Sequence, residues 1–234
     1  AFVPEPSANL IKRITLTEKD GALVGANAYE GTEFLTSTDE RFRPVNLYNG
    51  PDGALYVVDF YRGILQHRIY ITSFLRQQID ERGLAAGRGL GRIWRIAPEG
   101  AARANFKEIA LARASVAELV QSLGDDNGWV RDTAQRLLVE RRDPALVKPL
   151  RGAVRSITAP PAARLHALWA LDGLGGDALD RATVIASLRD KDGAVAAAAV
   201  RLSERFVRLE AFAPEIAARL ASLVKALRER AIEV

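Results

Sequence analysis

The residues that could take part in binding or catalysis lie close together in the first third of the sequence: Arg41, Arg43, Asp59, Arg62 and His67. An arginine guanidinium is a planar fork of donors, so Arg43 suits a carboxylate, either on a ligand or on Asp39 or Asp59. Asp59 could in turn contact a cofactor, a cation or Arg43. His67 is the only histidine in the first hundred residues. A histidine can act as a general base in an oxidation, and a surface or interface position is the alternative for this one.

Several kinds of catalytic and metal site are excluded by composition. The chain has no cysteine, so it holds no disulfide, thiolate metal site, cysteine nucleophile or covalently attached c-type haem. GxSxG and HExxH motifs are also missing. The carboxylates Asp125, Asp126, Asp190 and Asp192 fall in loops before expected helices, where helix capping explains them. The sequence therefore predicts no metal site and identifies no catalytic residue.

Short antiparallel strands are predicted around the candidate residues. Residues 45–48 and 54–61 are β-prone, and the five residues between them hold two glycines, a proline and two Asx residues. This pattern favours a tight reversal of the chain. Residues 91–97 alternate Ile and Trp with Arg and predict a further strand of the same sheet. Asp59 then falls near the end of the second strand.

Upstream, residues 10–17 and 22–28 flank Asp20-Gly21, a dipeptide that strongly favours a hairpin. Several short strands at such spacing indicate that the N-terminal part is all-β.

An insertion from residue 63 to residue 90 separates two strands that would otherwise be hairpin neighbours. Its centre, residues 73–82, has apolar residues at helical spacing and an N-cap candidate in Thr72 or Ser73, which predicts a short helix.

Downstream of residue 105 the composition shifts to Ala, Leu and Arg at helical spacing, and an internal repeat appears. The repeat places equivalent residues 33 and then 32 positions apart, as in Arg131 and Arg164, Leu138 and Leu171, and Ala167 and Ala199. Paired helices at this period indicate a HEAT-like α-solenoid. The expected shared core contains Leu137, Leu138, Leu168 and Leu171. The sequence thus predicts two domains, residues 1–104 and residues 105–234.

Overall composition limits the partners of the chain. Its 234 residues are 48% apolar, yet no apolar run is long enough to cross a membrane. The net charge is +4, but the 33 basic residues are scattered among 29 acidic ones. A solvated helix surface explains this distribution better than a phosphate-binding stripe, so no nucleic-acid partner is expected.

Three segments of the N-terminal part resemble the final blade of a bacterial family of membrane-bound dehydrogenase-like proteins: EFLTSTDERFRPV (33–45), NGPDGALYVVDFYRGILQHR (49–68) and GRGLGRIWRI (87–96). FVPEPSANLIKR near the start is similar to a strand pair of the preceding blade. In the helical part, NGWVRDTAQRLLVERRD (127–143) and RLHALWALDGL (164–174) resemble the repeats of the same family. That family joins a β-propeller, similar to that of quinoprotein sugar dehydrogenases, to HEAT-like repeats.

The resemblance implies a cofactor and residues that would bind it. In quinoprotein sugar dehydrogenases, arginines on the strand before the GPDG turn bind the carboxylates of pyrroloquinoline quinone (PQQ). The matching positions are Arg43 and Arg41, with Asp59, Arg62 and His67 as supporting residues. The family also implies a c-type cytochrome domain or other electron acceptor as partner, and a periplasmic or extracytoplasmic location.

The number of residues limits what the chain does alone. A propeller blade needs roughly 40–50 residues and a ring usually at least four blades, so residues 1–104 supply about two. The chain is therefore expected to be the C-terminal part of a PQQ-dependent sugar or alcohol dehydrogenase-like protein, inactive and without bound cofactor by itself. The remaining blades would be its partners, together with a protein bound to the solenoid. The alternative is a non-catalytic module that binds protein or glycan through its blades and repeats.

Overall fold

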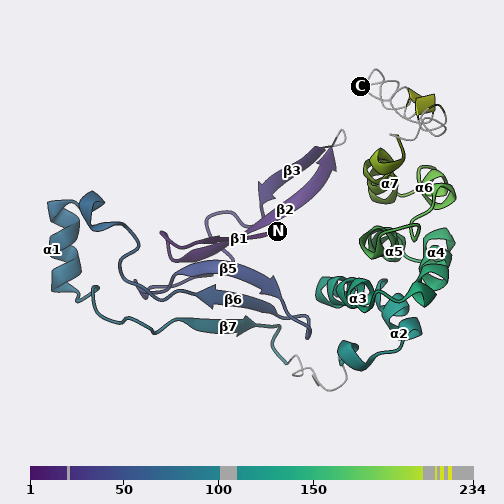
Figure 1. Ribbon diagram of the computed structural model, residues 1–234. Helices are drawn as coiled ribbons and strands as arrows, with labels where there is room; N and C mark the ends of the chain where they lie inside the picture. The colour runs from purple at the N-terminus through teal and green to yellow at the C-terminus, as the bar shows by residue number, and fades with distance from the viewer. Residues whose placement is uncertain (20–21, 101–109, 208–213, 215–216, 219–220, 223–234) are drawn as a thin grey trace. The chain divides into compact units, whose positions relative to one another are not determined.

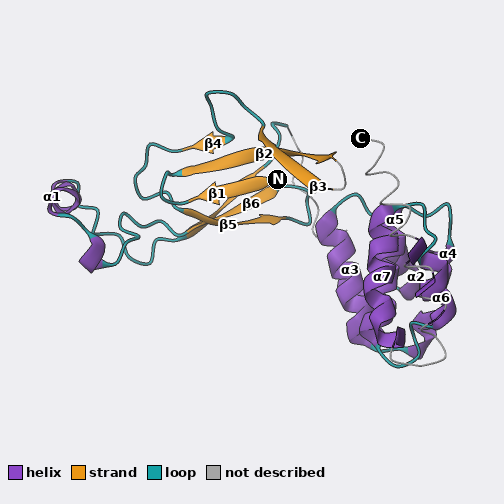
Figure 2. Cartoon of the chain, turned by 90° about the horizontal axis from the view of Figure 1, so that it is seen from above, coloured by secondary structure: helices purple, strands orange, loops and turns teal. Residues whose placement is uncertain are grey.

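The structure is a computed structural model that describes residues 1–19, 22–100 and 110–207, together with 214, 217–218 and 221–222. The chain divides into two compact units, Ala1–Arg103 and Ala104–Val234. The first, the sheet unit, contains the strands, and the second, the helical unit, contains helices (Figures 1 and 2). The predicted class, β followed by α in separate parts, is therefore confirmed. The predicted boundary between residues 104 and 105 lies outside the described residues.

The first sheet is organised around one long strand, β2 (Leu10–Lys19), which is rich in Ile and Thr. The first half of β2 pairs antiparallel with β1 (Phe2–Glu5) and β4 (Leu35–Thr36). Its second half pairs with β3 (Ala22–Asn27), from Ile14 opposite Asn27 to Lys19 opposite Ala22. The predicted hairpin pairing is thus confirmed, while its turn residues 20–21 lie outside the described part of the chain.

The second sheet is the antiparallel meander β5–β6–β7, formed by Pro44–Asn49, Leu55–Asp59 and Arg92–Ile96. The turn between β5 and β6 needs glycine at two positions. Gly53 has φ of +74°. A methyl group at Gly50 would lie 2.2 Å from the Cε2 atom of Tyr56, so the tyrosine ring closes over this glycine. The three strands predicted around the candidate residues are confirmed.

The insertion between β6 and β7 forms a 3₁₀ turn, η1 (Arg68–Tyr70), and one helix, α1 (Ser73–Glu81). The Thr72 hydroxyl caps α1 by accepting the N–H of Leu75 at 3.3 Å, which decides between the two cap candidates. Helix α1 buries none of its residues. The insertion contacts the strand region through Arg41, whose Nη2 donates to the Gly83 carbonyl, and through an ion pair of Arg82 with Glu40.

The core of the sheet unit is small. Its cluster of buried apolar residues consists of Ile11, Phe42 and Val57, with four partly buried neighbours around it. By contrast, the helical unit has a cluster of seventeen buried residues. The sheet unit therefore leaves much of its apolar surface exposed.

The helical unit is built from short and long helices in alternation. The short ones are α2 (Val116–Ser122), α4 (Val147–Arg155) and α6 (Arg181–Ser187). The long ones are α3 (Gly128–Arg141), α5 (Pro161–Leu174) and α7 (Gly193–Val207), and the 3₁₀ turns η2 (Leu111–Arg113) and η3 (Pro144–Leu146) precede α2 and α4. Neighbours within each set are in contact, so the short helices form one row and the long helices another (Figure 1).

The sequence repeat corresponds to equivalent packing positions in the long helices. Ala134, Ala167 and Ala199 lie 33 and 32 residues apart, and all three are fully buried. Because alanine is small, neighbouring helices approach closely at these positions. Leu138, Leu168 and Leu171 are also fully buried as predicted, whereas Leu137 packs at the edge of the core and is partly buried.

Candidate functional site

Arg43 lies at the start of β5, and its guanidinium binds main-chain carbonyls on two loops. Nε donates to the Arg62 carbonyl at 2.8 Å and Nη2 to the Gly63 carbonyl at 3.1 Å. Nη1 donates to the carbonyls of Pro6, at 2.7 Å, and Ser7, at 3.3 Å. Burial lowers the pKa of Arg43 from its usual value, and the nearby carboxylate of Glu40 opposes that shift. The side chain thus ties the β1–β2 loop to the segment that follows β6.

Asp59, at the end of β6, is 1% exposed and binds donors with both carboxylate oxygens. Oδ1 accepts the main-chain N–H of Arg43 at 2.8 Å and of Tyr61 at 2.9 Å. Oδ2 accepts the Trp94 indole N–H at 3.0 Å and lies 3.4 Å from Nε of Arg92. A buried carboxylate is tolerated only when it is paired and hydrogen-bonded in this way. The side chain that pairs with Asp59 is Arg92, and Arg43 reaches Asp59 only through its main-chain N–H. The expected pairing of the Arg43 guanidinium with Asp39 or Asp59 is not observed in the described structure.

This arrangement does not fit a quinone carboxylate at Arg43. A bidentate clamp needs two parallel N–H groups, taken either from Nε and Nη2 or from Nη1 and Nη2. Each of those pairs already donates to main-chain carbonyls. A ligand carboxylate would have to displace them and leave partly buried carbonyls without donors. The assignment of Arg43 to PQQ stays a prediction that this geometry does not support.

The other candidate residues do not converge on one site. The Arg41 guanidinium donates to the Gly83 carbonyl at 2.9 Å. That of Arg62 lies over the Phe60 ring, 5.5 Å from its centroid. His67 is exposed, with its ring 6.3 Å from that of Tyr70, and its Nδ1 faces the N–H of Ile69 at 3.5 Å. No contact joins His67 to Arg43 or Asp59 in the described structure, and the histidine lies at the surface.

A small cleft does adjoin Arg43. It has a volume of about 300 Å³ and lies between Gly63 and helix α1. Its polar side chains include Glu40 and Arg82, which form an ion pair with each other. The cleft therefore offers mainly apolar surface from α1 rather than free charged groups.

Two ionic clusters in the second sheet were not anticipated from the sequence. Arg92 stacks over the Tyr61 ring, 3.6 Å from its centroid, while it faces Asp59. At the other end of the sheet, Arg95 lies 2.6 Å from Oδ2 of the buried Asp52. Burial alone raises the pKa of Asp52, but hydrogen bonds from Arg95, Ala54 and Tyr56 outweigh it and lower that pKa. The alternation of arginines with apolar residues on β7 is the feature of the sequence from which these two clusters could have been predicted.

In the helical unit, equivalent arginines bind equivalent loops. Arg131 on α3 donates to the carbonyls of Asp125, at 2.6 Å, and Asp126, at 3.0 Å. Arg164, 33 residues later on α5, donates to the Ala159 carbonyl and also pairs with Asp190. The expected capping role holds for Asp192, which accepts the N–H groups of Ala194 and Val195.

The capping role expected for Asp125 and Asp126 is wrong in detail. The N-cap of α3 is Asn127, whose side chain accepts the N–H of Trp129 at 3.0 Å. Asp125 instead accepts the N–H of Asn127, at 2.7 Å. Asp125 is therefore two residues too early in the chain to cap the helix.

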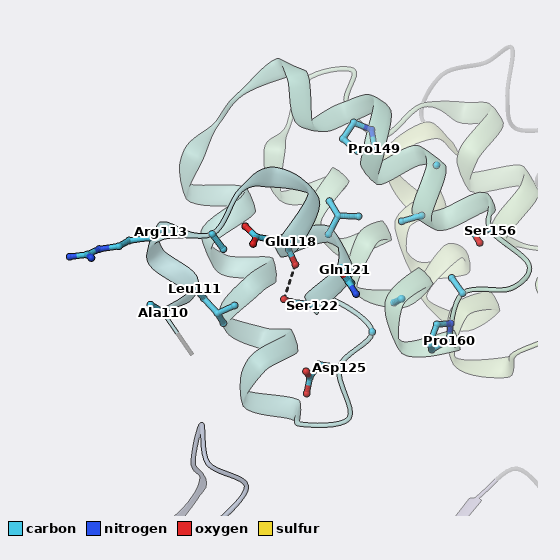
Figure 3. A pocket seen from close by; sticks show the side chains of 17 residues that line it. Ala110, Leu111, Arg113, Glu118, Gln121, Ser122, Asp125, Pro149, Ser156 and Pro160 are labelled. Carbon is cyan, nitrogen blue, oxygen red and sulfur yellow. Dashed lines mark hydrogen bonds between the residues drawn. The ribbon is translucent and has the colours of Figure 1, made fainter. Parts of the chain in front are cut away.

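A broad hollow of about 980 Å³ lies between α2 and α4 (Figure 3). Much of its lining is Ala, Gly and Pro, and two of its polar residues bond to their own helix. The Ser122 hydroxyl donates to the Glu118 carbonyl at 2.8 Å, and the Glu118 carboxylate forms a capping box with Ser115. The side chain of Arg113 points away from the hollow (Figure 3). This surface contains no constellation for catalysis.

A second hollow, of about 450 Å³, lies one helix pair further along, between α4 and the segment that follows α6. It is here called the basic cleft. It differs from the first hollow in the charged residues that line it: Arg155, Arg164, Arg189, Lys191 and Asp190.

The described residues show neither a metal site nor a helix that could span a membrane. They contain no cluster of three or more His, Asp or Glu side chains placed to hold a metal ion. Nor do they include a helix with the length and apolar character that a bilayer span requires.

The architecture defines a chain in which two small antiparallel sheets precede rows of paired helices. A family model described as a domain of unknown function, DUF7133, matches residues 1–100. That match covers the sheet unit and ends before the helical unit. A comparison with curated proteins found no match, and neither did a comparison with solved structures.

Proposed function

We propose that this chain is the non-catalytic C-terminal part of a larger dehydrogenase-like β-propeller protein, in which it docks other polypeptide rather than carrying out oxidation. One observation carries the proposal. Of the eighteen large apolar side chains exposed in the described residues, seventeen belong to the sheet unit. Contiguous exposed apolar surface on a soluble protein marks an interaction site.

The exposed residues lie on both sheets. In the first sheet Leu23 is 72% exposed, and in the second Tyr48 is 57% and Ile93 is 68% exposed. Five buried apolar residues among the described ones, three of them in one cluster, are few for a unit of about a hundred residues, because a stable domain of this size buries most of its apolar surface. The exposed apolar faces of the sheets therefore need a packing partner. Further antiparallel sheets suit them, because the blades of a propeller pack face to face.

We propose that the remaining propeller blades of the parent protein cover these sheet faces. The antiparallel meander β5–β6–β7, with its helical insertion, supports this proposal, as does the resemblance of its GPDG turn and flanking strands to a final blade. If the parent oxidises sugars or alcohols with PQQ, the residues that hold the quinone are proposed to lie outside this chain. In this proposal Arg43 and Asp59 stabilise the fold. Arg43 binds main-chain carbonyls, and Asp59 binds the side chains of Trp94 and Arg92.

The helical unit is proposed to be a HEAT-like solenoid that binds a protein partner. The two rows of helices, the buried alanines at 134, 167 and 199, and the equivalent loop contacts of Arg131 and Arg164 support this assignment. Stacked repeats expose extended surfaces that other solenoids use for binding. An electron acceptor such as a c-type cytochrome domain, in a periplasmic setting, is the partner that the resemblance implies.

The test is association with the polypeptide encoded immediately upstream in the same reading frame. Purified separately and mixed, the two parts should form a stoichiometric complex by size-exclusion chromatography, and β5 and β7 should gain protection from hydrogen exchange. The variant Ile93→Asp should weaken the complex. Ile157→Asp, a matched change at a 94% exposed isoleucine of the helical unit, should leave it intact. Absence of any complex would overturn the docking proposal.

A separate titration addresses the non-catalytic assignment. The chain alone should bind no PQQ, and Arg43→Ala should make no difference to the titration. Tight, stoichiometric binding that Arg43→Ala abolishes would show that this chain contributes a quinone site.

A further inference from the structure

The basic cleft of the helical unit contains positive charge that the fold does not use. Arg189 and Lys191 are exposed, and neither has an ion-pair partner among the described residues. Arg155 makes one described hydrogen bond, from Nη2 to the Thr183 hydroxyl at 3.4 Å. Arg189 and Lys191 thus line a hollow of about 450 Å³ without an ion-pair partner in the described structure, and Arg155 lies beside them with one long hydrogen bond.

The nearby carboxylates are hydrogen-bonded to other groups, although the charge of Asp180 also acts on Arg155. Asp190 is held by Arg164 through bonds of 2.7 and 2.8 Å. Asp180 lies 3.0 Å from Arg151 and caps α6 through the N–H of Thr183. Asp192 accepts two N–H groups at the start of α7. An incoming anion therefore meets an excess of positive charge at the rim of the cleft.

The cleft also has an apolar part. Val154 is buried at its base, and Ala186 contributes to its wall. Ile157 lies on the same cleft and is 94% exposed, the one large apolar side chain of the helical unit so exposed in the described residues. An exposed isoleucine next to basic side chains suits a partner that has both an apolar side chain and negative charge.

This character is specific to the basic cleft and does not repeat along the helical unit. The equivalent hollow between α2 and α4 is lined by one basic residue, Arg113, and two carboxylates, Glu118 and Asp125. Repeat packing alone would give similar linings at successive helix pairs. The concentration of basic residues at the second hollow is a local property of α4 and the segment after α6.

We infer that the basic cleft binds an acidic peptide segment of a partner protein, with carboxylates at Arg155, Arg189 and Lys191 and an apolar side chain against Ile157. The inference rests on the proposed role of the helical unit as a partner-binding surface, and it adds the chemistry of the partner. Charge complementarity of this kind sets specificity and speeds association.

A peptide fits better than a nucleic acid. Proteins that bind single-stranded nucleic acids commonly stack bases on aromatic rings, and no aromatic residue lines this cleft. The apolar contact at Ile157 has no use against a phosphate backbone. The volume also suits a few side chains rather than a continuous groove.

The experiment is a fluorescence-anisotropy titration of the full chain with a short labelled peptide of glutamate residues interspersed with leucine. The double variant Arg189→Gln/Lys191→Gln should weaken binding by about two- to thirtyfold, the range that two exposed ion pairs contribute together. Arg155→Gln and Ile157→Asp should each weaken it as well. Arg201→Gln, which removes an exposed charge of α7 outside the cleft, is the matched control and should leave the affinity unchanged. Added salt should weaken binding to the unmodified chain more than to the double variant.

Each other outcome overturns the inference. If the peptide did not bind, or if Arg201→Gln lowered its affinity equally, the cleft would not be the binding site. Equal affinity for a peptide with glutamine in place of glutamate would remove the role of charge. A single-stranded oligonucleotide that binds more tightly, with the same dependence on Arg189 and Lys191, would make the partner a nucleic acid. Because Ile93→Asp should not alter peptide binding, failure here is distinguishable from failure of sheet docking.

Discussion

The guanidinium of Arg164 on α5 faces the carboxylate of Asp190, which precedes α7, in a two-bond pair. Nε lies 2.7 Å from Oδ2, and Nη2 lies 2.8 Å from Oδ1. The two side chains are 10% and 12% exposed. The hydrogen bond from Arg164 is the main reason that the pKa of Asp190 lies below its usual value. The pair links one helix pair to the next through side chains separated by 26 residues.

Breaking this pair should destabilise the helical unit. Asp190→Asn leaves Arg164 with a buried charge and no counter-ion, so we expect the free energy of unfolding to fall by about 2–4 kcal/mol. Urea denaturation followed by far-UV circular dichroism measures this free energy of unfolding. Asp177→Asn, at an exposed carboxylate without a described side-chain partner, is the control and should change stability little. Equal losses in both variants would contradict the prediction.

The equivalent arginine one repeat earlier lacks such a partner. Nε of Arg131 is buried and has no hydrogen-bond acceptor in the described structure. Thr158 lies three residues before α5, as Asp190 does before α7. Thr158→Asp should supply the missing carboxylate and raise the free energy of unfolding by about 0.5–1.5 kcal/mol. Thr158→Asn should gain less because it lacks charge. A gain that persists in an Arg131→Met background would show that another contact is responsible.

Arg43 should be a stability residue of the sheet unit. Arg43→Gln removes the donors to the carbonyls of Pro6, Ser7, Arg62 and Gly63. We expect a loss of about 1–3 kcal/mol, because partly buried carbonyls are left without donors. Hydrogen exchange should become faster in the loops that contain these residues. Arg62→Gln, which keeps its carbonyl and loses only contact with the Phe60 ring, should cost about 1 kcal/mol or less. The reverse order of the two losses would contradict the assignment.

The stability of the helical unit should fall at mildly acid pH through His166. Its Nδ1 lies 2.6 Å from Oε1 of Gln135, which joins α5 to α3. Burial lowers the pKa of His166, Asp132 opposes that shift and Arg131 adds to it. Because the folded pKa lies below the unfolded value of about 6.5, the unfolded chain binds the proton first, and stability is lost as pH falls through that range.

Denaturation curves at neutral pH and near pH 5 measure this effect. His166→Gln should remove the part of the pH dependence that lies in that range. The carboxylates Asp180 and Asp190, whose pKa values are also lowered, contribute in a separate range below about pH 4. An unchanged pH profile for His166→Gln would show that the histidine is not the responsible group.

Much of the secondary structure follows from local sequence. The strands around the turn at residues 49–53 have alternating β-prone residues, and that turn has glycines where the backbone requires them. The helix starting at Ser73 has a threonine cap immediately before it. The buried alanines at 134, 167 and 199 are predicted from their spacing, because equivalent positions of stacked repeats face the same neighbour.

The candidate site could not be predicted in the same way. Arg43, Arg41, Arg62 and His67 were selected by residue type and by a resemblance, and neither says which acceptors surround a side chain. The Arg43 guanidinium meets carbonyls of loops as far as 37 residues away in the sequence. Main-chain carbonyls leave no mark in the sequence, since every residue has one.

By itself, the sequence determined the division into strands and then helices, the register of the repeats, and the lack of any cysteine chemistry. These depend on local propensity, periodicity and composition, which a single chain displays directly. Only the tertiary structure decided that Arg43 and Asp59 are committed to the fold, that Arg164 rather than Arg131 has a carboxylate partner, and that Arg155, Arg189 and Lys191 share one cleft. Those facts depend on which distant segments of the chain come into contact, and the packing of each whole unit decides those contacts.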